Sequence, residues 1–369
     1  MRKRSKREPP GDASSTRAAK MESTVPDPII AGGEKFPASA SPDPATKFQQ
    51  TPMFMGILNE LNVNQDQLLR RQALITEIEK ELTSRYGAAN RMMSYVIRFG
   101  HPRSSMSSND ISSFESVLNS ISGAEQINLL LHSPGGDATI VEKMVDMCRT
   151  HLSGDKCRLR VIVPNIAKSA ATVMALGADT IVMGYCSELG PIDPQVQIAV
   201  SGVMHWVSSL AFVESRDTLM NEIADAMIKR KPTAGLLQQL AGLNIPFTHE
   251  MENWIGFANK TAATLLDKYM LRSKFPNART RKRKAKEIAE KLLSKQLFPV
   301  HGQFIDGATA QKLDLEVEIL DRADKLWDLI WQYYIRSEVQ MNIPIQLPMI
   351  KIKLFESSQL SLVQQDTVS

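Results

Sequence analysis

The sequence predicts an α/β fold built on a mainly parallel sheet. Short strand-like and helix-like segments alternate between residues 94 and 183. One of the expected strands, residues 127–132 (INLLLH), is almost continuously apolar, which is typical of a parallel strand covered on both faces. Compact strand–helix–strand units of this kind require right-handed crossovers between parallel strands, so each helix packs back onto the sheet.

The expected elements follow in chain order. Strands are predicted at residues 94–99, 127–132, 159–163, 180–183 and 315–320. Helices are predicted after a cap at Asn109-Asp110, after the break at Gly135-Gly136, and from a start near Ser169. Residues 205–297 look mainly helical, with a break near Asn244–Pro246, and we interpret them as an insert in the fold.

The two ends of the chain differ from this core, and they set the expected domain limits. Residues 1–50 are rich in Pro, Ser, Ala and basic residues, which predicts a disordered tail, and residues 51–90 have the apolar spacing of a helical arm. The main α/β domain is expected over residues 91–322, and an aromatic helix followed by an irregular tail over residues 323–369.

Composition excludes several classes of protein. The chain has 369 residues, 44 basic and 40 acidic, and this balance argues against a dedicated nucleic-acid binder. The basic run at residues 279–286 has no interleaved aromatic residues, so a solvated helix face is expected there. Three cysteines without a CxxC pair argue against a disulfide framework or a zinc knuckle. No membrane span or secretory signal is apparent, so a cytoplasmic location is expected.

The first chemical feature is the turn at residues 132–137 (HSPGGD). Glycine allows backbone conformations closed to other residues, and it lets a ligand approach the amide N–H groups. Two such groups at the end of a strand, just before a helix, can stabilise a developing oxyanion. Gly135 and Gly136 are therefore candidate substrate-binding residues, and His132 before them is expected in a supporting role. The motif alone is also compatible with an ordinary turn.

The second feature is Ser169, which follows the strand at 159–163 and lies among the small residues Ala167, Ala170 and Ala171. A serine at a helix start is often only an N-cap. Small neighbours would also let a substrate carbonyl reach its hydroxyl, and the helix start would favour negative charge there. A rigid turn, residues 187–195 (SELGPIDPQ), is a third element that could shape the site.

Together these elements resemble a known superfamily that comprises the Clp protease proteolytic subunit, signal peptide peptidase A and the crotonases. The sequence is most similar to the branch known as the serine dehydrogenase proteinase family. The shared runs are HSPGG at residues 132–136, then VP, S, T and ALGAD between residues 163 and 179, then LGPIDPQ at residues 189–195. The resemblance is tight over residues 127–196 and looser over 93–320.

The resemblance implies a Clp protease/crotonase-like spiral of αββ units, to which the helical arm and the helical insert are added. It implies that Ser169 is the nucleophile of a serine peptidase, and that the amides of Gly136 and Ala170 form the oxyanion hole. It also implies a peptide or protein substrate and a homo-oligomer. No metal and no cofactor are expected.

The general base does not follow the patterns of the superfamily. A serine hydroxyl needs an adjacent base at neutral pH. The Clp-type pattern places a histidine in the loop after the nucleophile's helix, but residues 187–194 contain none. The signal-peptide-peptidase pattern places a lysine downstream of the serine, and the next lysine here is Lys229.

Four residues remain as candidates for the base. His301 lies in the unit that closes the fold, near the place of the Clp-type acid, and Asp193 is expected to orient it. Lys229 is the second choice, if burial lowers its pKa. Lys168 is interpreted as a surface or substrate-binding cation, since adjacent helix residues do not face each other. His205 is interpreted as structural.

Three functions remain open on the sequence alone. The leading hypothesis is a serine endopeptidase, and the alternative is a catalytically inactive Clp-like protein that binds peptides or acts as a scaffold. A crotonase-type acyl-CoA enzyme is the third, but only Asp137, Glu188 and Asp193 supply carboxylates near the motifs, and no nucleotide-binding signature is present.

Overall fold

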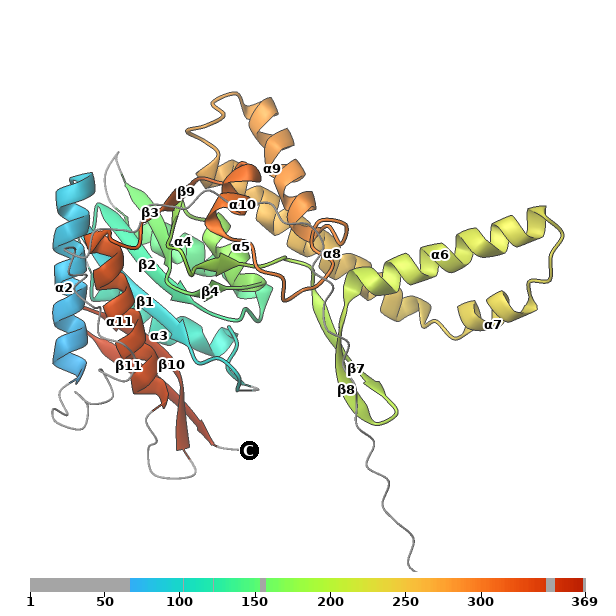
Figure 1. Ribbon diagram of the computed structural model, residues 1–369, viewed down its shortest axis with the longest axis horizontal. Coiled ribbons are helices and arrows are strands. Elements are labelled where there is room, and N and C mark those ends of the chain that lie inside the picture. The colour runs from blue at the N-terminus through green and yellow to red at the C-terminus, as the bar shows by residue number, and fades with distance from the viewer. Residues whose placement is uncertain (1–66, 102, 122, 153–156, 343–348, 368–369) are drawn as a thin grey trace, which may run out of the picture. The chain divides into compact units, whose positions relative to one another are not determined.

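The computed structural model describes residues 67–101, 103–121, 123–152, 157–342 and 349–367 (Figure 1). The predicted tail at 1–50 and the first part of the predicted arm, 51–66, lie outside these residues. Within them a seven-stranded sheet has the order β11-β10-β1-β2-β3-β5-β9. Its strands are β1 (Asn90–Ile97), β2 (Gln126–His132), β3 (Arg158–Val163), β5 (Thr180–Met183), β9 (Val317–Ile319), β10 (Met349–Ser357) and β11 (Ser361–Thr367).

The five strands from β1 to β9 are parallel, so the predicted α/β class with a mainly parallel sheet is confirmed. Each of the predicted core strands is present, with ends shifted by a few residues. A short second sheet pairs β4 (Ile166–Ala167) with β6 (Glu188–Leu189) and lies next to the candidate site.

Helices cover both faces of the sheet. One face packs against α2 (Gln67–Tyr86) and α11 (Lys325–Asn342). The other face packs against α3 (Ile111–Asn119), α4 (Val141–His151) and α5 (Ala170–Leu176). Side chains alternate along β1 accordingly, with Met92 and Val96 on the first face and Met93 and Tyr95 on the second.

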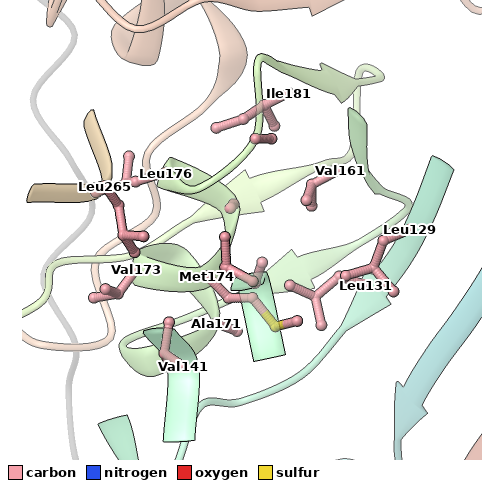
Figure 2. Packing of buried hydrophobic residues seen from close by; sticks show 14 of the residues in the cluster. Leu129, Leu131, Val141, Val161, Ala171, Val173, Met174, Leu176, Ile181 and Leu265 are labelled. Carbon is pink, nitrogen blue, oxygen red and sulfur yellow. The ribbon is translucent and has the colours of Figure 1, made fainter. Parts of the chain in front are cut away.

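Helix α5 is buried along its whole length, and this fixes the residue at its start. Val173, Met174 and Leu176 belong to the same apolar cluster as β2, β3 and β5 (Figure 2). Full burial of one such side chain contributes about 1.5–3 kcal/mol to the free energy of unfolding. The backbone at Ser169, immediately before α5, is therefore attached to the centre of the core.

The insert differs in part from its prediction. It begins as an antiparallel ribbon of β7 (Gln195–Val200) and β8 (Val203–Ser208), so the prediction of helix from residue 205 is wrong at its start. The helices then follow as α6 (Ser209–Ile228), α7 (Ala234–Ala241), α8 (Ile245–Leu265), the π-helical turn η3 (Leu266–Met270) and α9 (Ala278–Leu293). The predicted break is present, because Asn244 caps α8 and Pro246 lies in its first turn.

The C-terminal segment also differs. The predicted aromatic helix is α11, but the predicted irregular tail is wrong over residues 349–367, because β10 and β11 form a hairpin that extends the sheet beyond β1. In this hairpin Lys353 pairs with Asp110 at 2.6 Å and Glu356 pairs with Arg71 at 2.8 Å, and all four side chains are buried. Buried partners, rather than solvent, compensate these charges.

Candidate active site

Ser169 lies in a strained backbone turn, which we call the nucleophile turn (residues 166–170). Its φ is +50° and its ψ is −118°, in a region that residues other than glycine rarely adopt. Two hydrogen bonds hold this turn to the end of β2, since Ser133 donates its N–H to Ile166 O and Lys168 donates its N–H to Ser133 O, both at 3.0 Å. Strain of this kind persists only where the surrounding structure enforces it.

The hydroxyl of Ser169 does not stabilise the local structure through a hydrogen bond. It does not cap α5, and within the described part of the chain its Oγ makes no hydrogen bond. The residue is partly exposed, so the hydroxyl is open to a substrate. The alternative interpretation of Ser169 as an ordinary N-cap therefore fails.

The glycine turn (residues 133–137) lies against the nucleophile turn. Gly135 has a φ of +103°, and a Cβ atom there would lie 2.8 Å from both the carbonyl oxygen of Lys168 and the Cβ of Ser169. Gly136 has a φ of +142°, and its Cβ would lie 2.4 Å from the carbonyl oxygen of Met106. Both positions therefore require glycine, for conformation and for space.

Two backbone donors remain unused beside Ser169. The N–H of Gly135 donates to Ser133 Oγ at 3.0 Å. In contrast, the N–H groups of Gly136 and Ala170 donate no hydrogen bond to any residue that the structure describes. Ala170 begins α5, where the helix leaves such groups free. A pair of free N–H groups at a nucleophile is the arrangement that binds an oxyanion.

His301 and Asp193, which are 108 residues apart, are brought together. The Nδ1 of His301 lies 2.7 Å from Oδ1 of Asp193, as expected for an oriented base. This contact leaves the Nε2 of His301 as the nitrogen that can exchange protons. His301 Nε2 and Ser169 Oγ form no direct hydrogen bond within the described residues, and such bonds often close only when substrate binds.

Asp193 is almost completely buried, and several donors surround its carboxylate. Its Oδ2 accepts from Gln195 Nε2 at 2.9 Å and from Ser208 Oγ at 2.8 Å, and it pairs with Lys295 Nζ at 2.8 Å. Burial alone would raise the pKa of Asp193, but the hydrogen bonds from His301, Lys295 and Ser208 outweigh it and lower this pKa. Asp193 is therefore a charged, fixed partner for His301.

Lys168 is not the free cation that the sequence suggested. Its Nζ pairs with Glu188 Oε2 at 3.0 Å and donates to the carbonyl oxygens of Leu189, Gln303 and Gly302 at 3.2, 3.3 and 3.4 Å. Burial lowers the pKa of Lys168, and the pairing with Glu188 only partly opposes this shift. A substrate-binding role does not fit, because these contacts already occupy the ammonium group.

His132 is buried at the end of β2 and supports the turn. Its Nδ1 accepts the N–H of Ile166 at 3.4 Å, and its ring packs on Tyr334 with centroids 4.9 Å apart. Burial lowers the pKa of His132 from 6.5 to about 3, so the ring is neutral at physiological pH. His132 therefore contacts the backbone of the nucleophile turn from inside the core.

The structure does not support the prediction that Lys229 is a desolvated base. Its side chain is 55% exposed at the end of α6, and its ammonium pairs with Asp225, four residues earlier, at 2.6 Å. A lysine needs burial to lose its proton near neutral pH, and Lys229 lacks it. His205 lies in β8 with its side chain exposed, and it is not a buried structural residue.

Several residues of the site were not predicted. Lys295 and Ser208 bind the carboxylate of Asp193. Thr172 Oγ1 contacts the carbonyl oxygens of Ala167 and Gly190. Met106 donates its N–H to Gly135 O and accepts the N–H of Asp137, so its backbone holds the glycine turn on both sides of Gly136. Of these residues, only Thr172 could have been identified from the sequence, because it is part of the shared motif. The other three come from segments whose approach to the site depends on the whole fold.

Neither a metal-binding cluster nor a membrane-spanning helix is found in the part of the chain that the structure describes. No group of three or more His, Cys, Asp or Glu side chains there is arranged to hold a metal ion. No helix there is long and apolar enough to cross a bilayer.

Comparison with known sequences gives a family and two relatives. A family model for ClpP-like SDH-type serine proteinases matches residues 50–235, which include Ser169 and Asp193 but end before His301. The uncharacterized proteins MJ0137 and MJ1495 of Methanocaldococcus jannaschii are 36% identical over 85 residues and 30% identical over 132 residues. These matches cover 22% and 35% of this chain, and only 28% and 43% of the relatives' own length.

Two solved structures are similar at low identity. One is a serine-to-alanine variant of the 1510-N membrane-bound stomatin-specific protease, at 16% identity and a TM-score of 0.34, covering 58% of this chain and 75% of that one. The other is a lysine-to-alanine variant of the same protease in complex with a substrate peptide, at 14% identity and a TM-score of 0.28. That match covers 67% of this chain and 96% of the solved one.

Proposed function

Because the chain belongs to the ClpP-like SDH-type serine proteinase family, we propose that it hydrolyses peptide bonds with Ser169 as the nucleophile, His301 as the general base and Asp193 as the orienting carboxylate. The observation that carries this assignment is the 2.7 Å contact between His301 Nδ1 and Asp193 Oδ1. It directs the other ring nitrogen away from the carboxylate and fixes the tautomer that a base requires.

The proposed reaction follows from this geometry. Ser169 Oγ attacks the peptide carbonyl carbon while its proton moves to His301 Nε2, and the carbonyl oxygen takes up the negative charge. The free N–H groups of Gly136 and Ala170 stabilise that charge. His301 then gives the proton to the leaving amine, and an acyl group remains on Ser169. Water, deprotonated by His301, hydrolyses this ester and restores the hydroxyl.

The proposed triad exchanges the acid and the base relative to the Clp-type order. In that order the histidine follows the nucleophile's helix and the acid lies in the closing unit. Here Asp193 follows α5 and His301 lies before α10 (Gly307–Lys312). The exchange keeps the contact between the two side chains, and triads are recognised by geometry rather than by chain order. It also explains why a search for a histidine at residues 187–194 fails.

A peptide-binding protein without turnover is the second candidate function. The observation that favours it is the absence of a hydrogen bond between Ser169 Oγ and any described residue, His301 included. Such a protein would bind unfolded peptide without cleaving it. The homo-oligomer and the cytoplasmic location stay predictions from the sequence.

A fluorophosphonate probe separates the two candidates, since it reacts only with an activated serine. We expect labelling of the full chain, its loss in Ser169→Ala, and a fall of at least about 10³-fold in rate in His301→Ala. Ser116→Ala on α3, whose hydroxyl only bonds Ser112 O, is the matched control and should label normally. Labelling that persists in Ser169→Ala, or an unlabelled native protein that still binds peptide, would overturn the proposal.

A further inference from the structure

Lys168 connects three segments that meet at the candidate site. It precedes Ser169 in the nucleophile turn, and its ammonium pairs with Glu188 and reaches the carbonyl oxygen of Leu189, both in β6. The same ammonium reaches the carbonyl oxygens of Gly302 and Gln303, the two residues that follow His301. We call residues 301–305 the base loop.

The path of the Lys168 side chain depends on Gly190. A Cβ atom at Gly190 would lie 2.6 Å from Cδ of Lys168, while Cα and Cβ of Lys168 would remain at 3.4 and 3.5 Å. The φ of Gly190 is not positive, so space rather than conformation requires glycine there. Because glycine has no side chain, the stem of Lys168 has the space to pass Gly190 and reach the base loop.

Backbone hydrogen bonds also connect the base loop to β6. Leu189 and Ile305 form an antiparallel bridge, with N–H···O distances of 2.9 and 3.0 Å in the two directions. This bridge holds the far end of the loop. The end next to His301 is held by Lys168 and by the contact between His301 and Asp193.

We propose that Lys168 is a positioning residue, whose ammonium holds the base loop so that His301 faces Ser169. This inference rests on the proposed function of Ser169 and His301. A displacement of about 1 Å in a catalytic group can reduce the rate about 10²-fold, so an anchor at the residues next to His301 matters for turnover. Glu188 pairs with the same ammonium at 3.0 Å and so holds it beside the loop.

The first test replaces the ammonium while keeping an unbranched apolar stem. We expect Lys168→Met to lower kcat and the rate of fluorophosphonate labelling about 10- to 100-fold, with KM for a peptide substrate changed less than about twofold. Lys284→Met is the matched control, because Lys284 is also partly buried and paired, with Asp314 at 3.1 Å, but lies on α9. It should retain the native rates, and thermal unfolding should show both variants folded.

The second test asks whether Lys168 acts through His301. In a His301→Ala background, where the residual rate is measured at high probe concentration, Lys168→Met should change labelling less than about twofold. Equal falls in the two backgrounds, or no fall in the native one, would overturn the inference. A native labelling rate in His301→Ala alone would instead overturn the proposed function.

The third test moves the lysine stem without removing its charge. Gly190→Ala should lower kcat about 5- to 10-fold, because the new methyl group displaces Cδ of Lys168. In a Lys168→Ala background the stem is absent, so Gly190→Ala should then have almost no further effect. An undiminished effect of Gly190→Ala in that background would contradict the proposed role of the stem.

Discussion

The proposed nucleophile side and the proposed base side of the candidate site are built in different ways. Gly135, Gly136 and Ser169 are held by backbone conformation and by a helix that is buried in the core. Asp193 and His301 are held by side-chain contacts between residues 108 apart in the chain. One half of the site is thus a rigid backbone arrangement encoded by neighbouring residues, and the other half is a pair of side chains that meet only in the folded molecule.

The largest effect is expected from a substitution on the base side, at Asp193. Asp193→Asn should lower kcat by about 10³–10⁴-fold, because an amide cannot hold His301 in the tautomer that accepts a proton. Peptide turnover measures it. Ser208→Ala, which removes only one hydrogen bond to Asp193, should cost less than about 10-fold. The double variant Asp193→Asn/Lys295→Met removes the unpaired charge and should remain inactive; recovery of activity there would mean that charge balance, not orientation, is the role of Asp193.

A smaller effect is expected from a substitution on the nucleophile side, at Gly135. Gly135→Ala should slow fluorophosphonate labelling about 10²–10³-fold, because the methyl group collides with Lys168 O and Ser169 Cβ and shifts the oxyanion donors. Gly123→Ala is the control, since Gly123 also has a positive φ, of +75°, but has no atom within 4 Å of the added carbon. Equal losses in both variants would assign the effect to backbone strain alone.

Lys295→Met removes a positive charge next to Asp193 but leaves Asp193 and His301 in place. Without this ammonium the Asp193 carboxylate keeps its hydrogen bonds from Gln195 and Ser208 but loses a neighbouring positive charge that opposes protonation of His301. The acid limb of the kcat/KM profile should therefore move up by about one pH unit. Asp193 has a pKa below 3.8 in the native state, so its stabilising effect is present above pH 3.8 and is lost as the pH falls through that lower value. In the variant the pKa of Asp193 should be lowered less, so the total loss of stability should be smaller and should be complete at a higher pH. An unchanged profile would show that Lys295 does not act on the pair.

The smallest effect concerns the support behind the nucleophile side. The pKa of His132 falls from 6.5 to about 3 on folding, so the unfolded chain binds a proton below pH 6.5 that the native state excludes. Native stability should therefore decrease as the pH falls from 6.5 toward 3. His132→Asn keeps an acceptor for Ile166 N–H but does not titrate, so urea unfolding should show a shallower acid-side loss. The same slope as in the native chain would contradict burial of a neutral ring.

The sequence predicted the features that depend on local patterns. The parallel strands, the break at Gly135-Gly136 and the helix after Ser169 follow from apolar runs, glycine and small residues near one another in the chain. The approach of His301 to Asp193 was expected only because the resemblance places the Clp-type acid near His301. No local pattern connects those two residues.

The features that the sequence did not predict depend on long-range contacts. The segment at residues 349–367 was predicted as an irregular tail, because the partners of Lys353 and Glu356, Asp110 and Arg71, lie more than 240 residues away in the chain. Lys229 was a candidate because sequence spacing does not show whether its part of α6 is buried. Lys168 was interpreted from its neighbour Ser169, whereas its ammonium contacts residues about 20 and 134 positions further along.

The most direct test of the proposed site is a crystal structure of the chain with a phosphonate bonded to Ser169 Oγ. The proposal predicts that Nε2 of His301 lies about 3 Å from Ser169 Oγ, and that the phosphonyl oxygen accepts hydrogen bonds from Gly136 N–H and Ala170 N–H. An adduct in which another side chain occupies the place of His301, or in which those two N–H groups point away from the phosphonyl oxygen, would contradict it.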